Sequence, residues 1–100
     1  MDNYINQIKQ EYAFFYDKCL RTINDWLDDN DDTQECRIEC LYRTAVTNIA
    51  TNDVINHFIN CGYTFSVEYR TLWEDKDDDY PTFQGYIFTL KVNKRPKINH

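Results

Sequence analysis

Residues 27–40 read LDDNDDTQECRIEC, and the interpretation of this stretch decides how many helices the sequence predicts. Its first half holds four aspartates and an asparagine, residue types that favour helix ends and turns over helix interiors. Asp32 or the threonine after it can cap a following helix, with Glu35 placed as in a capping box. Cys36 and Cys40 then stand four residues apart, the spacing of one helix face. The stretch therefore predicts the end of one helix and the start of a second.

Before this stretch, residues 3–27 carry apolar residues at three- and four-residue steps, which predicts a long amphipathic helix. These residues are Ile5, Ile8, Tyr12, Phe15, Cys19, Ile23 and Trp26. After it, we expect the second helix to run to about residue 50. A polar break at residues 51–53 precedes a short third helix over residues 54–60. Gly62 stands where the glycine that ends a helix commonly lies.

Beyond Gly62 the apolar period changes to two, which is the period of a half-buried strand. Residues 63–73, YTFSVEYRTLW, and residues 83–92 both alternate in this way. A polar loop joins them, so an antiparallel hairpin is the simplest pairing. A two-stranded sheet is marginal alone and has to pack on the helices. We therefore predict an α+β fold, with three helices, one of them long and N-terminal, followed by an antiparallel β-hairpin packed on them.

The length and charge of the chain narrow its organisation and its partners. One hundred residues predict a single domain, residues 1–100, with a flexible basic tail from about residue 93. Lys and Arg number 11 and Asp and Glu 17, so the formal net charge is −6. An acidic surface repels nucleic acid and attracts basic proteins. No secretory signal or membrane-length apolar run is apparent, so we expect reduced cysteines and a cytoplasmic location.

The segment that begins at Asp28 resembles an EF-hand loop. Asp28, Asn30 and Asp32 stand at its first, third and fifth positions, and Glu39 stands at the twelfth. The sixth position of that loop is a glycine, and here it is Thr33, which removes the sharp turn that aims the ligands. The resemblance implies a degenerate calcium binder over residues 28–39, which we keep as a third hypothesis for the function.

Two pairs of potential metal ligands share a four-residue spacing. They are Cys36 with Cys40, and His57 with Cys61. Two crossing helices that carry these pairs could supply three sulfurs and one nitrogen, a ligand set that zinc accepts. This supports an alternative function, a small structural or assembly protein that is stabilised by zinc or dimeric through the hairpin edge. Because a buried reduced thiol is the commoner state of cysteine, the prediction is no metal and no cofactor.

Catalytic motifs are lacking in the sequence. The two histidines are His57 and His100, and His57 with Cys61 has no obvious third group to orient it. With only two glycines, a glycine-rich phosphate loop cannot form. We therefore predict that the protein is not an enzyme and has no catalytic residues.

Two acidic runs and nearby aromatic residues are the predicted contact site for a partner. The alternative without a binding role is a pair of solvated loops that keep an aromatic-rich chain soluble. The predicted partner-binding residues are Asp25, Asp28, Asp29, Asp31, Asp32, Glu35, Trp73, Glu74, Asp75, Asp77, Asp78, Asp79 and Tyr80.

In size, acidity and lack of catalytic groups, the chain is similar to small acidic inhibitors made by phages and mobile elements. Those proteins mimic nucleic acid and block restriction, CRISPR or other nucleic-acid enzymes. The resemblance implies a non-catalytic inhibitor in the host cytoplasm that binds a basic surface of a nucleic-acid-binding enzyme or complex. We expect no direct contact with nucleic acid or membrane, and a homodimer is possible on this interpretation.

Overall fold

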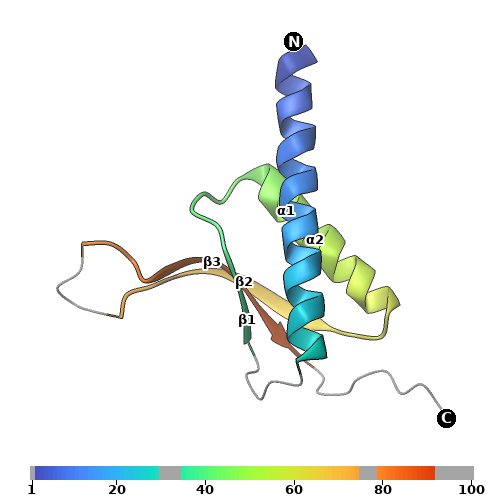
Figure 1. The fold of residues 1–100 in the computed structure, drawn as a ribbon, viewed down its shortest axis with the longest axis vertical. Coiled ribbons are helices and arrows are strands. Elements are labelled where there is room, and N and C mark those ends of the chain that lie inside the picture. The colour runs from blue at the N-terminus through green and yellow to red at the C-terminus, as the bar shows by residue number, and fades with distance from the viewer. Residues whose placement is uncertain (1, 30–34, 75–78, 92–100) are drawn as a thin grey trace.

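The computed structural model of the 100-residue chain describes residues 2–29, 35–74 and 79–91. This part of the chain forms two helices and one three-stranded antiparallel sheet (Figure 1). The elements in chain order are α1 (Asp2–Asp28), β1 (Glu35–Glu39), α2 (Ala45–Asn60), β2 (Phe65–Leu72) and β3 (Phe83–Leu90). The α+β class fits the sequence prediction, but the three-helix arrangement is wrong. The predicted tail, residues 93–100, lies outside the described residues.

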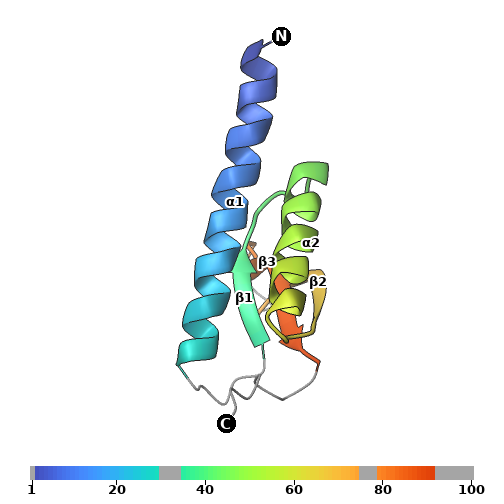
Figure 2. The ribbon, with the colours of Figure 1, turned by 90° about the vertical axis from the view of Figure 1, so that its right-hand side faces the viewer.

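Helix α1 agrees with the prediction for residues 3–27. Its 27 residues span about 40 Å, and its N-terminal part extends past the rest of the molecule (Figures 1 and 2). Phe15, Cys19 and Ile23 face the core, as the four-residue steps predict. No helix in the described residues is long and apolar enough to cross a membrane.

The sheet has the order β1-β3-β2, and both neighbouring pairs are antiparallel. The predicted hairpin is present as β2 and β3, with Phe65 opposite Leu90 and Leu72 opposite Phe83. Strand β1 pairs with the other side of β3, where Glu35 lies opposite Thr89. The central strand β3 is thus hydrogen-bonded on both sides, and β1 and β2 form the edges.

Strand β1 replaces the start of the predicted second helix. On a helix, Cys36 and Cys40 would lie nearly opposite Ile38; on a strand, all three face the same side. Cys36 and Ile38 are only 4% and 1% exposed, and Arg37 and Glu39 between them are exposed. The burial of side chains in this segment therefore alternates with a period of two. Five residues are too few for this alternation to predict a strand when Cys36 and Cys40 stand at helical spacing. Pairing with β3 decides the matter, because it satisfies the backbone hydrogen bonds of the segment.

Helix α2 runs without interruption through residues 51–53, where we predicted a break between two helices. It begins after Thr44, which forms a capping box with Thr47. The polar residues within it find partners that do not compete for the helical N–H groups. The Thr51 hydroxyl donates to the Thr47 carbonyl at 2.7 Å, and Asp53 accepts from the Tyr12 hydroxyl at 2.5 Å. Gly62 follows the helix with a φ of 97°, as predicted for a helix-ending glycine.

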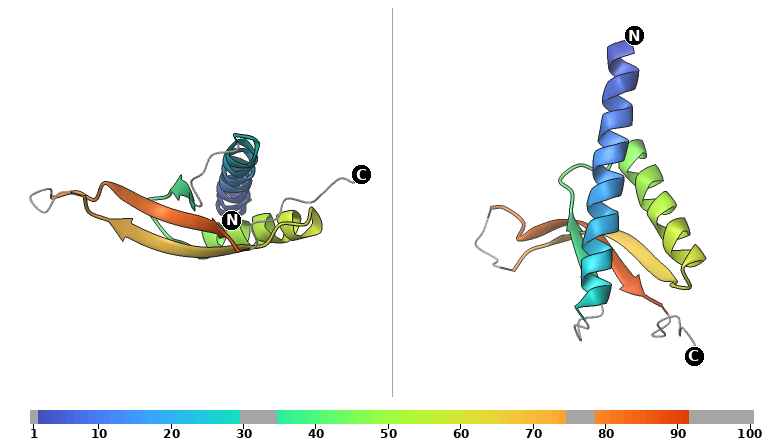
Figure 3. Two further views of the ribbon diagram at one scale, coloured as in Figure 1. Left: turned by 90° about the horizontal axis from the view of Figure 1, so that it is seen from below. Right: turned by 45° about the vertical axis from the view of Figure 1, so that its right-hand side comes forward.

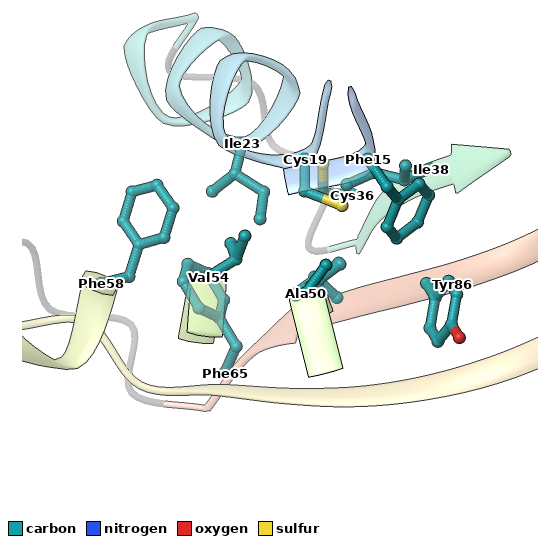
Figure 4. Packing of buried hydrophobic residues seen from close by; sticks show 11 residues of the cluster. Phe15, Cys19, Ile23, Cys36, Ile38, Ala50, Val54, Phe58, Phe65 and Tyr86 are labelled. Atoms are coloured by element: carbon teal, nitrogen blue, oxygen red, sulfur yellow. The ribbon is translucent and has the colours of Figure 1, made fainter. Parts of the chain in front are cut away.

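The hydrophobic core lies where α1 and α2 meet the inner face of the sheet. Figure 4 shows Cys19 and Ile23 of α1 directed toward the α2 side chains. Aromatic rings join the helices to the strands. The Phe58 and Phe65 ring centroids are 5.6 Å apart, and Phe65 lies 6.1 Å from Phe88. In the left view of Figure 3, α1 lies over one side of the sheet.

The outer face of the sheet is covered by charged side chains. Ile87 is 0% exposed, although it points away from the helices on the opposite face from Phe88. Arg37 and Glu68 flank it on the two neighbouring strands. Arg70 forms an ion pair with Glu68 and another that reaches across to β1. The aliphatic stems of such side chains can exclude water from an apolar neighbour.

Candidate binding surfaces

Three exposed carboxylates lie at the C-terminal end of α1. Asp25, Asp28 and Asp29 are exposed, and none of them forms an ion pair with another described residue. The last turn of the helix holds no basic residue. Because the C-terminal end of a helix is already partially negative, carboxylates there destabilise the helix. These three carboxylates, named here the α1 acidic end, therefore form a negative surface that helix stability does not explain.

Glu35 belongs to the same run of sequence but differs from the α1 acidic end. Its carboxylate lies 3.6 Å from the Arg37 guanidinium and 3.9 Å from that of Arg70. These contacts neutralise much of its charge on the outer face of the sheet. The predicted residues Asp31 and Asp32 lie outside the described residues.

The second acidic run lies at the tip of the β2–β3 hairpin. Glu74 and Asp79 are exposed there, and the neighbouring aromatics Trp73 and Tyr80 are 57% and 81% exposed. The Glu74 N–H donates to the Thr82 hydroxyl at 3.1 Å, which joins the two arms of the loop. Exposed aromatic residues of this kind are common at the centres of protein interfaces. The remaining predicted residues of this run are outside the described part, namely Asp75, Asp77 and Asp78.

The two acidic runs lie at opposite ends of the sheet. Glu35 is opposite Thr89, near the end of β3, while the hairpin tip follows the pair of Leu72 with Phe83 at its start. Six residues of strand separate Thr89 from Phe83, which corresponds to about 20 Å. Figure 1 also shows the β2–β3 hairpin extending away from the C-terminal end of α1. A small basic patch can therefore contact one run, whereas contact with both requires an extended partner surface.

The proposed metal ligands do not converge. Cys36 is buried in the core and Cys61 is exposed beyond the end of α2. No group of three or more potential metal ligands forms among residues 2–29, 35–74 and 79–91. The zinc site predicted as an alternative is therefore wrong for Cys36, Cys40, His57 and Cys61. The EF-hand hypothesis fails as well, because Glu39 lies in a strand where that motif requires a helix.

Burial keeps the core thiols protonated. Desolvation raises the pKa of Cys36 to about 12. It also raises the pKa of Cys19 to about 12, which nearby Lys18 only partly opposes. A neutral thiol is a poor nucleophile and a poor metal ligand. These two cysteines therefore act as small apolar residues of the core.

A polar groove between α2 and β2 was not expected from the sequence. It has a volume of about 230 Å³ and is lined by Arg43, Asn48, Thr51, Asn52, Val67, Glu68, Tyr69 and Tyr86. The Arg43 guanidinium lies 5.9 Å from the centroid of the Tyr69 ring. Nothing in the local sequence marks Arg43, because its neighbours in the groove come from a helix and two strands that follow it in the chain.

An exposed apolar face forms where α1 extends past the core. Tyr4, Ile5 and Ile8 of α1 and Ile49 of α2 are all exposed. A shallow depression of about 240 Å³ lies among Ile8, Ile49 and their neighbours. Contiguous apolar surface of this kind often marks a contact with another molecule.

Comparisons with family models, with curated proteins and with solved structures find no match for this chain.

Proposed function

We propose that this chain is a non-catalytic binding protein whose α1 acidic end contacts a basic surface of a protein partner. The observation that most supports this is the position of Asp25, Asp28 and Asp29 at the negative end of a helix, exposed and without ion pairs in the described chain. This arrangement opposes the helix dipole, so it reduces folding stability. A contact with a cationic partner gives it a purpose.

The more specific form of the proposal is an inhibitor of a nucleic-acid-binding enzyme or complex, acting in the cytoplasm, of the type that phages and mobile elements produce. The Cβ atoms of residues three and four apart on a helix lie about 5–6 Å from one another, so aspartates at these spacings carry neighbouring charges. Such closely spaced charges can occupy a groove that binds the phosphates of a duplex. Electrostatic attraction makes association of this kind fast and sensitive to salt.

Displacement from DNA tests this proposal. Proteins of a bacterial lysate are bound to DNA-cellulose, and the chain is added at low and at high salt. We expect a small set of proteins to be released at low salt. The triple variant Asp25→Asn, Asp28→Asn and Asp29→Asn should release much less protein. It lacks the three carboxylates that attract the positively charged partner.

A matched variant at the other end of the sheet, Glu74→Gln with Asp79→Asn, serves as the control. It also removes negative charge but leaves the α1 acidic end intact. If the chain releases no protein, or if the triple variant releases as much as the unaltered chain, the proposal is wrong. Equal losses in the two variants would indicate that net charge acts without a specific site.

A second candidate, an assembly protein, is supported by the apolar face of Tyr4, Ile5, Ile8 and Ile49. The occupant of that face would be a second copy of the chain, since Lys9 is the only charged residue among the described residues that line the depression. Sedimentation over a range of concentrations separates the two candidates. A monomer throughout favours the inhibitor, and a dimer that Ile49→Glu dissociates favours the assembly protein.

A further inference from the structure

The groove between α2 and β2 lies along an open edge of the sheet. Strand β2 is an edge strand, with β3 on one side and no strand on the other among the described residues. On this open side the groove is bounded by Asn48 and Asn52 of α2 and by Val67 and Tyr69 of β2. Figure 1 and the right view of Figure 3 show α2 beside the first half of β2. The groove thus combines a strand edge with the side chains of a helix.

The hydrogen-bond pattern of the sheet determines which backbone groups face the groove. The Lys91 N–H donates to the Thr64 carbonyl at 2.8 Å, which makes these two residues a hydrogen-bonded pair. Such pairs alternate along an antiparallel ladder, so Glu68 turns its N–H and C=O toward β3. Val67 and Tyr69 turn theirs outward. Of the three β2 residues that line the groove, Val67, Glu68 and Tyr69, the first and the last therefore have open backbone donors and acceptors.

The side chains of Val67 and Tyr69 lie on the inner face of the sheet, and that of Glu68 lies on the outer face. The Glu68 carboxylate is paired with Arg70 there. It therefore does not neutralise the arginine at the groove. Arg43 forms no ion pair with any described carboxylate, although the whole chain has a net charge of −6.

Asn48 is held in a fixed orientation at the groove. Its side-chain oxygen accepts from the Tyr86 hydroxyl at 2.6 Å and from Arg43 Nε at 3.3 Å. The Tyr86 hydroxyl is also 2.8 Å from the Thr47 hydroxyl inside the protein. These contacts leave the amide N–H groups of Asn48 as donors. The exposed amide of Asn52 has no hydrogen-bond partner in the described chain.

We propose that this groove binds an extended peptide segment of another protein as an added strand on β2, with a carboxylate of that segment against Arg43. The outward N–H and C=O groups of Val67 and Tyr69 supply the main-chain hydrogen bonds, and Asn48 and Asn52 offer further donors. Strand addition gains affinity from the main chain and specificity from such flanking side chains. This site is independent of the α1 acidic end, so it goes beyond the proposed function.

A second copy of the chain fits the groove less well than an acidic peptide does. Two β2 edges that pair around a two-fold axis at Tyr69 would bring both copies of Arg43 close to the axis. Like charges so placed oppose association. Each copy also carries a net charge of −6. The unpaired guanidinium instead favours a partner segment that contains Asp or Glu.

Hydrogen exchange of single amides tests the proposal directly. The probes are decapeptides selected on the immobilised full chain from a random phage library and then synthesised. We expect the selected peptides to contain Asp or Glu. In the free protein, the amides of Val67 and Tyr69 should exchange quickly and that of Glu68 slowly. A bound peptide should slow exchange at Val67 and Tyr69, because these amides then donate to it.

Two variants and a control complete the test. Arg43→Gln should weaken peptide binding by about tenfold or more, the usual loss for a hydrogen bond to a charged group. Val67→Pro removes an outward N–H and leaves the hydrogen bonds to β3 in place. Edge strands tolerate proline at such a position. This variant should also weaken peptide binding. Arg21→Gln alters an exposed arginine on α1 and should leave the affinity unchanged. Circular dichroism checks the fold of each variant.

Three results would overturn the proposal. The first is a selection that gives no peptide with a Kd below about 100 µM. The second is peptide binding that Arg43→Gln does not weaken and that does not slow hydrogen exchange at the Val67 and Tyr69 amides. The third is protection of these amides in the free protein that grows with protein concentration, which would identify a second copy as the occupant.

Discussion

At the scale of single residues, a close backbone contact at Gly85 constrains the sheet. Gly85 lies on the central strand, opposite both Glu39 of β1 and Arg70 of β2. A Cβ atom at this position would collide with the Ile38 carbonyl oxygen and would lie 2.7 Å from the Cys40 nitrogen. The first atom belongs to the backbone of β1, and the second belongs to the residue that follows this strand and donates to the Gln84 carbonyl of β3, so neither can move without disturbing the strand pair.

Gly85→Ala is therefore expected to destabilise the protein by about 1–3 kcal/mol or more, because β1 has to shift away from β3. Urea denaturation followed by tryptophan fluorescence measures the loss. A free energy of unfolding that stays within about 0.5 kcal/mol of the unaltered chain, the range of ordinary surface substitutions, would show that β1 does not approach Gly85 so closely.

At the scale of elements, the cap at Thr44 explains where α2 begins. Thr44 accepts a hydrogen bond from the Thr47 N–H at 3.1 Å, and the Thr47 hydroxyl lies 3.0 Å from the Thr44 nitrogen. This box uses Thr in place of the usual Glu at its last position. The sequence predicted an earlier helix start, capped by Asp32 or Thr33, because Glu35 stands at the usual spacing from Asp32.

Thr44→Ala should destabilise the protein by about 1 kcal/mol, because it removes the side-chain cap of α2. Thermal unfolding by circular dichroism measures the effect. Thr64→Ala is the matched control, since Thr64 is exposed and its hydroxyl forms no hydrogen bond with another described residue. Equal losses in both variants would contradict the role of Thr44 as the cap.

At the scale of the whole molecule, the buried thiols couple stability to pH. Burial raises the pKa values of Cys19 and Cys36 to about 12 in the folded protein, above the ordinary thiol value of 9.0. Above pH 9 the unfolded chain therefore loses these protons while the folded protein keeps them. Stability is fully present below pH 9 and is lost as the pH rises toward 12.

We expect the free energy of unfolding to fall by about 1.4 kcal/mol per pH unit for each buried thiol above pH 9. Urea denaturation at pH 8, 9 and 10 in a reducing buffer measures this slope. Cys36→Val should reduce the slope, and Cys61→Ser, at an exposed cysteine, should not change it. An unchanged slope in Cys36→Val would show that Cys36 is accessible to water in the folded state.

Much of the fold follows from periodicity that is local in the sequence. The seven apolar positions of residues 3–27 specify α1, and the alternation after Gly62 specifies the β2–β3 hairpin, because each pattern repeats often enough to identify its period. The acidic runs and the exposed aromatics of the hairpin tip could also be identified as candidate contacts. Whether they bind a partner stays a prediction.

The tertiary structure decided the state of residues 35–39 and the composition of the groove. This segment is short, and Cys36 in it and Cys40 after it stand at helical spacing, so its local sequence fits a helix or a strand equally well. Only the open side of β3 selects the strand, by offering hydrogen bonds that are distant in the chain. Arg43, Asn48 and Tyr69 meet for the same reason: the sequence fixes the chemistry of each side chain, and the folded chain determines which of them are neighbours.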